Sequence, residues 1–243
     1  PRPDAAFALH IFPTIAGGLV ATRPGALLAS TDALNATIRG KGGHAAMPYD
    51  AVDPIPVACE AVMAAQAFIA RRTPFFDPAV LSVTSIHAGT AYNIVPDAVE
   101  LKGTLRTLSD ERRTEGKVAF ERIMRQVAAA HECEADVRID EGYPATRNDP
   151  RAVAIVQDIA TDLFGADAFH EMPTAIMGGE DFAYVLREIP GAMAFIGVAP
   201  PGEAAHGRPP LHNGKMTVHE DWLQRGVALH CAFATRFLAR GFD

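Results

Sequence analysis

Residues 33–62, ALNATIRGKGGHAAMPYDAVDPIPVACEAV, decide the fold because a strand, a glycine loop and a helix start follow one another there. Residues 33–39 alternate apolar with polar side chains, which predicts a strand with one buried face. After the glycine loop at 40–44, Asp53-Pro54 is typical of a helix start, with Asp as N-cap and Pro in the first turn. The apolar residues that follow predict the inner face of this helix: Ile55, Ala58, Val62, Ala65 and Ile69.

The segment after this helix completes a small domain. Residues 80–86 and 98–105 read as strands, Ser109 starts a second helix, and residues 135–139 read as a last strand. The inner face of the second helix is predicted to carry Phe120, Ile123, Met124 and Val127. The order β-α-β-β-α-β predicts a ferredoxin-like sandwich, an antiparallel sheet with two helices on one face.

The flanking segments are predicted to form a second, mixed α/β domain. Residues 5–9 read as a buried strand, and a helix starts at Asp149-Pro150 with Ala152, Ile155, Ile159 and Leu163 inward. Further expectations are a short helix at 180–188, a strand at 192–198 and a final helix at 220–239. We therefore expect residues 32–141 to be an insert between two parts of one domain, 1–31 and 142–243. Because a sheet needs several strands, we expect further sequence upstream.

Composition excludes several classes of function. The net charge is −7 and no Lys/Arg cluster occurs, which argues against nucleic acid and anionic membrane as partners. No apolar run reaches the ~18 residues of a membrane helix. The three cysteines are widely spaced, so we expect free, buried thiols and a reducing compartment, the cytoplasm.

The chemistry available is that of histidines, carboxylates and arginine. There is no G-x-S-x-G elbow, no phosphate loop and no H-E-x-x-H pair, so a metal site must be assembled from distant loops. His10 follows a predicted strand and His212 lies in a proline-rich loop, settings in which ligands collect in α/β proteins. Each also fits an ordinary polar loop residue.

Four more residues are candidates. His44 follows two glycines that allow close approach to a ligand, or it simply belongs to a turn. Asn93 and Arg106 offer donors suited to a carboxylate, or are a turn residue and a surface residue. Glu180, with Asp181, follows two glycines and could instead cap a helix.

Six motifs occur in the order found in one family. Together they resemble the M20 peptidase family, in particular its amidohydrolase branch, which includes hippurate hydrolases and auxin-conjugate amidohydrolases. The motifs are LHIFP at 9–13, GKGGHAAMP at 40–48, NIVP at 93–96, GTLR at 103–106, GGEDF at 178–182 and LHN at 211–213.

The resemblance implies a metallo-aminopeptidase-like catalytic domain, incomplete in this chain, with an inserted ferredoxin-like lid that forms a homodimer. It implies two divalent metal ions, Zn, Mn, Co or Ni, with His10 a ligand to one and His212 a ligand to the other. Glu180 would lie beside the metal site and orient its ligands.

The resemblance also implies a small-molecule substrate, an N-acyl amino acid. Asn93 and Arg106 would bind its carboxylate, and His44 would bind the oxyanion or the carboxylate in the site of the partner subunit.

One departure from the family pattern concerns activity. The family's other ligands come from a Cys-Gly-His-Asp segment and a Glu-Glu pair whose first Glu is the general base, and neither occurs in this sequence. We therefore expect the 243-residue chain alone to have little or no amidase activity. The alternative function is a non-catalytic dimerisation or ligand-binding module derived from an M20 hydrolase. Among enzymes, an exopeptidase or a diaminopimelate-type deacylase is a weaker alternative.

Overall fold

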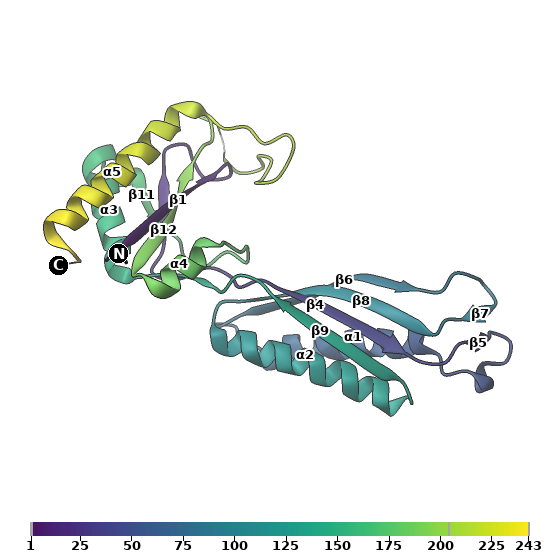
Figure 1. Ribbon diagram of the computed structural model, residues 1–243. Coiled ribbons are helices and arrows are strands. Elements are labelled where there is room, and N and C mark those ends of the chain that lie inside the picture. Colours follow the sequence, from purple (N-terminus) through teal and green to yellow (C-terminus); the bar gives the residue numbers. More distant parts are fainter. Residues whose placement is uncertain (1, 204, 243) are drawn as a thin grey trace. The chain divides into compact units, whose positions relative to one another are not determined.

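The computed structural model describes residues 2–203 and 205–242. The chain divides into two compact units, shown in Figure 1. Unit 1 contains the residues up to Leu28, Thr146–Ile176 and the residues from Asp181 onward. Unit 2 contains Ala29–Ala145 and Met177–Glu180. The mixed α/β fold expected from the sequence is confirmed, whereas the functional assignment of the units stays a prediction.

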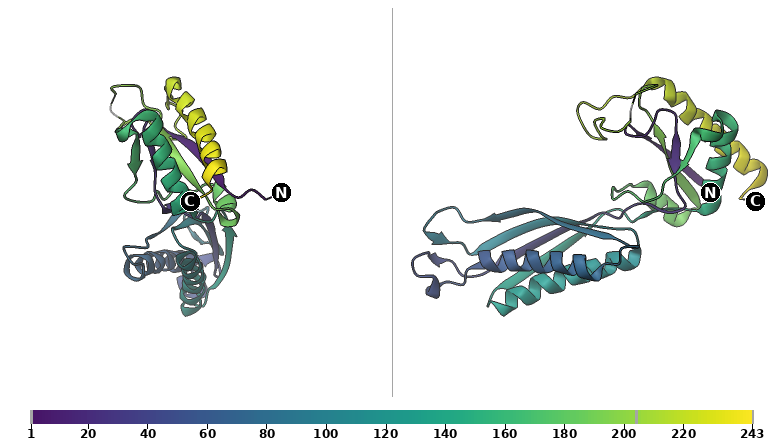
Figure 2. Two further views of the ribbon diagram at one scale, coloured as in Figure 1. Left: turned by 90° about the vertical axis from the view of Figure 1, so that its left-hand side faces the viewer. Right: turned by 180° about the vertical axis from the view of Figure 1, so that it is seen from behind.

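The sheet of unit 2 is antiparallel with the strand order β6-β8-β4-β9. These strands are β6 (Ala79–Ala88), β8 (Ala98–Thr107), β4 (Asp32–Arg39) and β9 (Glu134–Glu141). Two helices, α1 (Pro54–Arg72) and α2 (Asp110–Ala130), pack on one face of this sheet (Figures 1 and 2). A short antiparallel pair, β5 (Gly43–His44) with β7 (Ile94–Val95), and the 3-10 helix η1 (Pro48–Asp50) complete the unit.

Both long helices of unit 2 begin at the caps that the sequence predicts. The Asp53 side chain accepts a hydrogen bond from Ile55 N, and Ser109 accepts one from Arg112 N. The predicted inner face of α1 is confirmed for Ala58 and Ala65, which are buried, and is wrong for Ile55, which is 39% exposed. Pro54, Val57 and Ala61 are also buried. Small residues let this helix approach the sheet closely. Its apolar residues are spaced so that more than one face could be buried, and the sequence did not show which face turns toward the sheet.

Unit 1 has a mixed sheet with the strand order β1-β12-β2-β11. Its strands are β1 (Ala6–Phe12), β12 (Gly191–Gly197), β2 (Val20–Thr22) and β11 (Phe169–Glu171). β1 runs parallel to β12, β12 antiparallel to β2, and β2 parallel to β11. A separate antiparallel pair consists of β3 (Gly25–Leu28) and β10 (Thr146–Asn148). β2, β3, β10 and β11 were not predicted, because strands of three or four residues are too short to show an apolar–polar alternation in the sequence.

The helices of unit 1 cover its sheet. α3 (Pro150–Phe164) and α5 (Leu223–Arg240) contribute to one hydrophobic core with β1, β2 and β12. On the other face, Phe182 of the short helix α4 (Phe182–Glu188) packs against a cluster that includes Phe195. The 3-10 helices η2 (Ala166–Ala168) and η3 (Glu220–Trp222) precede β11 and α5. The predicted inward position of Leu163 is wrong, since it is 51% exposed and Val156 and Ala160 are buried instead.

The cysteine prediction is confirmed in part. All three thiols are free, but Cys59 and Cys231 are exposed and only Cys133 is buried. Burial raises the pKa of the Cys133 thiol, with a smaller contribution from Asp53. No helix in the described part of the chain is long and apolar enough to cross a membrane.

Candidate functional site

His10 lies in β1 of unit 1 beside the central strand β12. It occupies the fifth position of β1, in register with Phe195, so the strand extends beyond the predicted residues 5–9. β1 is half-buried throughout, not fully buried, because it has a single neighbour at the edge of the described sheet. The His10 Nδ1 atom lies 2.7 Å from the carbonyl oxygen of Ile11.

This contact determines the tautomer of His10. A carbonyl oxygen only accepts hydrogen bonds, so Nδ1 carries the proton and donates a hydrogen bond to Ile11 O. The lone pair is then on Nε2, the arrangement in which an imidazole binds a metal ion while a backbone carbonyl fixes its orientation. The chemistry of this donor therefore fits a metal ligand.

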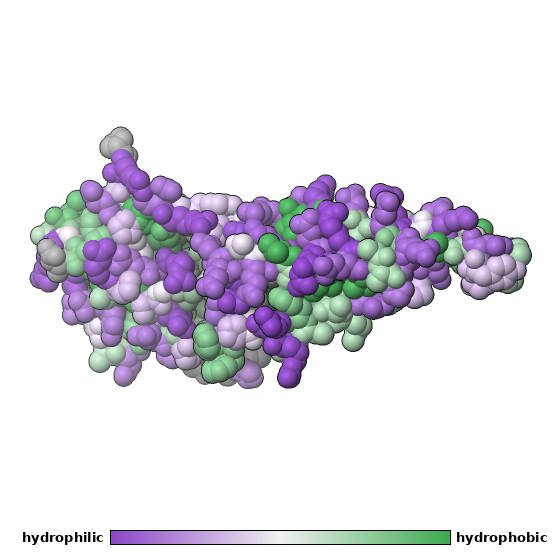
Figure 3. All heavy atoms as spheres, turned by 90° about the horizontal axis from the view of Figure 1, so that it is seen from below, coloured by the Kyte–Doolittle hydropathy of each residue, from purple (hydrophilic) through white to green (hydrophobic). Residues whose placement is uncertain are grey.

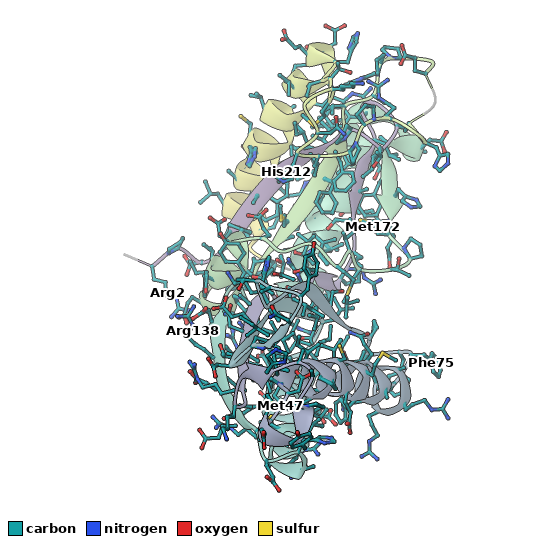
Figure 4. All side chains as sticks on the ribbon, turned by 90° about the vertical axis from the view of Figure 1, so that its right-hand side faces the viewer. Arg2, Met47, Phe75, Arg138, Met172 and His212 are labelled. Atoms are coloured by element: carbon teal, nitrogen blue, oxygen red, sulfur yellow. The ribbon has the colours of Figure 1, made fainter. Side chains whose placement is uncertain are left out.

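His212 lies in the long segment between β12 and η3, labelled in Figure 4. Its side chain is exposed and its backbone adopts a φ of 63°, in the left-handed region. A residue with a side-chain Cβ rarely adopts this conformation, and such positions cluster at functional sites and tight turns. Here a turn also accounts for it, because Asn213 N donates to Pro210 O.

The two imidazoles by themselves would not complete a metal site. Two ligands are fewer than the four that a typical zinc site has. Among the described residues, no group of three or more His, Cys, Asp or Glu side chains is arranged to hold a metal ion. The roles of His10 and His212 as ligands stay predictions.

His44 and Asn93 come together in unit 2. β5 and β7 pair His44 with Ile94, and Ala45 N donates to Asn93 O at 3.0 Å. Ala46 N donates to His44 Nδ1 at 3.1 Å, so Nδ1 is an acceptor and Nε2 carries the proton in the neutral ring. His44 thus has the opposite tautomer to His10. Its exposed ring can donate to an oxyanion or a carboxylate.

The end of unit 2 around His44 carries exposed apolar side chains. Met47, Tyr49, Tyr92 and Ile94 all lie in or beside the β5–β7 pair and are exposed. Figure 4 labels Met47 at this end, and Figure 3 shows pale and green atoms there among hydrophilic ones. Apolar side chains gathered around polar donors are typical of a contact surface.

Arg106 lies near the other end of the same sheet. It is half-buried in β8, where it is in register with Val80 of β6, and it lines a hollow of about 340 Å³. Its Nε donates to Thr104 Oγ1 at 3.1 Å. Sequence reasoning missed Thr104, although its position two residues before Arg106 puts both side chains on one face of the strand.

Glu180 is the last residue of the Met177–Glu180 segment, which belongs to unit 2. Ala29 N donates to Gly178 O at 2.8 Å, and a Cβ built on Gly179 would lie 3.5 Å from Arg106 Nη1. Glu180 therefore lies in the chain segment that borders the Arg106 guanidinium. It precedes α4, whose N-cap is Asp181, and the Asp181 side chain makes no capping hydrogen bond.

The structure does not bring Asn93 and Arg106 together within one chain. β8 begins three residues after β7 and Arg106 is its ninth residue, so at about 3.3 Å per residue the two lie on the order of 30 Å apart. One carboxylate cannot contact both side chains of the same copy.

Comparison with known proteins identifies the family of this chain. Residues 1–236 match the peptidase family M20/M25/M40. The chain belongs to this family. The M20 chain is 32% identical to the IAA-amino acid hydrolase ILR1-like 2 of Arabidopsis thaliana over 239 residues, 97% of this chain and 53% of that protein. It is 35% identical to an N-acetyldiaminopimelate deacetylase of Geobacillus sp. (strain WCH70) over 234 residues, 96% of this chain and 60% of that protein.

A solved structure supports the same family fold. The Bacillus subtilis YXEP protein, described as a dinuclear metal binding peptidase from the M20 family, superposes with a TM-score of 0.79 and 25% identity. The superposition covers 98% of this M20 chain and 58% of that protein. This chain therefore spans little more than half the length of the relatives it matches.

Proposed function

We propose that the protein hydrolyses the amide bond of N-acyl amino acids, hippurate-like molecules with a free α-carboxylate, by means of a metal-activated water. Family membership supports this proposal. So do the names of two relatives, an amino acid conjugate hydrolase and a deacetylase, because both describe cleavage of an acyl group from nitrogen.

Unit 1 would provide metal ligands. The His10 Nε2 lone pair and the His212 ring would each bind one of two divalent ions, Zn, Mn, Co or Ni. Glu180, a residue of unit 2, would be the residue that orients the ligands. Such ions, when bound, activate water and polarise the scissile carbonyl. The relative described as a dinuclear metal binding peptidase supports this assignment.

Unit 2 would be a ferredoxin-like lid and dimerisation domain that binds substrate. Its strand order and its two helices on one sheet face support the fold assignment. Arg106 would bind the α-carboxylate with its guanidinium, and Asn93 would donate to the substrate. His44 would donate from Nε2–H to the carboxylate or to the oxyanion that develops at the scissile carbonyl.

The separation of these side chains is the observation that supports a homodimer. His44 and Asn93 lie at one end of β8 and Arg106 lies near the other, so one copy cannot supply all three to one substrate. A second copy can supply His44 and Asn93 in trans. The exposed apolar residues beside His44 suit contact with that copy.

The test is complementation between two inactive variants of the complete natural protein, Arg106→Ala and His44→Ala. Random exchange of subunits in a two-fold dimer makes half of the molecules mixed, each with one intact site, so about a quarter of wild-type activity should return. Neither variant alone, taken through the same exchange procedure, should recover activity. Failure to recover where subunit exchange is demonstrated with differently tagged copies would refute the trans arrangement.

The catalytic assignment itself has a separate test. The complete protein should hydrolyse hippurate and lose that activity with a chelator, and the 1–243 polypeptide alone should show little or none with added metal. If the complete protein hydrolyses no N-acyl amino acid but binds hippurate, the non-catalytic ligand-binding function is correct instead.

A further inference from the structure

Two neighbours confine the guanidinium of Arg106. On one side, Thr104 Oγ1 accepts a hydrogen bond from Arg106 Nε at 3.1 Å. On the other side, Arg106 Nη1 lies 3.5 Å from the position of a Cβ built on Gly179. The guanidinium is therefore bonded at Nε to the hydroxyl of its own strand, and its Nη1 lies beside a side-chain-free part of the Met177–Glu180 segment.

The hydrogen bond to Thr104 selects how Arg106 can bind a carboxylate. A guanidinium forms a two-bond fork either side-on, through Nε and one Nη, or end-on, through Nη1 and Nη2. Because Nε–H is donated to Thr104, the side-on fork is engaged and the end-on fork remains.

The carboxylates around this hollow are engaged elsewhere. Asp32 forms an ion pair with Arg113, Glu141 with Lys117, and Asp140 with Arg138. All three carboxylates line the same hollow as Thr104 and Arg106. Each of these three carboxylates therefore pairs with a cation other than Arg106.

We infer that Thr104 is a positioning residue: its hydroxyl holds Arg106 Nε and presents the Nη1/Nη2 pair end-on to the α-carboxylate of the substrate. This inference rests on the proposed function and deepens it, because it assigns the specificity for a free carboxylate to a Thr104–Arg106 pair. An arginine free to rotate would lose side-chain freedom on binding, whereas a held one has already lost it.

The test compares Thr104→Val with Thr104→Ser in the complete protein. Valine has nearly the same shape and favours strands but cannot accept the hydrogen bond, whereas serine keeps the acceptor. The valine variant should raise KM for hippurate roughly 3–10-fold, the cost of ordering one freed arginine side chain on binding, with kcat nearly unchanged. The serine variant should stay near wild type, and KM for hippurate carboxamide should not change in either.

A second measurement does not depend on activity. In the ¹⁵N-labelled complete protein, the Nε–H proton of Arg106 should exchange with water several-fold faster in Thr104→Val than in wild type or Thr104→Ser. Circular dichroism of the valine variant checks that the fold is kept.

The two possible failures are distinguishable. If Arg106→Gln keeps the preference for hippurate over its carboxamide, the proposed role of Arg106 is wrong. If Arg106→Gln loses that preference but Thr104→Val matches Thr104→Ser in KM and in Nε–H exchange, the role of Thr104 alone is wrong. Equal KM increases for hippurate and its carboxamide in Thr104→Val would also overturn the inference.

Discussion

The buried ion pair between Asp32 and Arg113 offers the sharpest test of how unit 2 is held together. Asp32 is the first residue of β4, and both of its oxygens accept from Arg113 of α2, at 2.7 and 2.9 Å. The side chains are 0% and 8% exposed. Arg113 also donates to Gly142 O at 2.9 Å, so one guanidinium joins the start of β4 to the residue that follows β9.

Removing one charge should destabilise unit 2 strongly. In the native protein, hydrogen bonding to Asp32 raises the pKa of Arg113 against the effect of burial. A guanidinium stays protonated in proteins even without an acidic partner, so Arg113 stays charged in Asp32→Asn. Breaking a buried pair from one side costs about 3–5 kcal/mol. Because Glu141 lies 4.0 Å from Arg113 and remains, we expect the lower end, about 3 kcal/mol, which is more than a hundredfold in the opening equilibrium.

Hydrogen exchange measured by mass spectrometry reads this effect directly. Amides of β4 and α2 should exchange more than a hundredfold faster in Asp32→Asn under conditions where exchange follows the opening equilibrium. Trp222, the one tryptophan of the chain, lies in unit 1, so its fluorescence during urea unfolding reports that unit separately.

The matched control removes both charges. Asp32→Leu combined with Arg113→Met should be far less damaging than Asp32→Asn alone, because no uncompensated charge stays buried. A change in exchange of less than tenfold in Asp32→Asn would contradict this prediction, and so would a double variant as destabilised as the single one.

Two further predictions concern single contacts. Hydrogen bonding to Arg151 lowers the pKa of Asp149, the N-cap of α3, so its contribution is present above the carboxyl's unfolded pKa and is lost as pH falls through the folded pKa. Asp149→Ala should cost about 1 kcal/mol at pH 7 in urea unfolding followed by Trp222 fluorescence, and a gap that persists at a pH below the folded pKa would contradict this. A Cβ on Gly179 would overlap Thr31 Cγ2, so Gly179→Ala should cost about 1–3 kcal/mol in unit 2 by hydrogen exchange. Adding Thr31→Ser, which removes that methyl and keeps the hydroxyl, should restore most of the loss; no rescue would refute the overlap.

Local patterns in the sequence were sufficient for the elements of unit 2 and for the helix starts. Residues 33–39 alternate along a strand that the structure extends by one residue, to Asp32–Arg39. The caps Asp53, Ser109 and Asp149 each accept the hydrogen bond that their positions predicted. These features depend on neighbours within four residues, and a linear reading contains those neighbours.

Which face of each helix is buried was harder to predict from the sequence. Ile55 and Leu163 were expected inside but are 39% and 51% exposed. A run of alanines and branched residues has more than one apolar stripe at helical spacing, and the sheet decides which stripe it buries. Strands such as Val20–Thr22 were missed for a related reason, since their pairing partners lie far away in the sequence.

The sequence by itself determined the chemical types in the candidate site, the order of its motifs and the family to which they belong, because these follow from residue identity and spacing. Only the three-dimensional structure decided which nitrogen of His10 and of His44 carries the proton. The partners, Ile11 O and Ala46 N, are near in the sequence, but the side-chain rotamer decides which ring nitrogen faces them. The structure alone revealed that Thr104 holds Arg106 and that Asn93 lies at the far end of the strand from that arginine. Tautomers, orientations and separations depend on where the backbone places atoms in space, which residue identity does not specify.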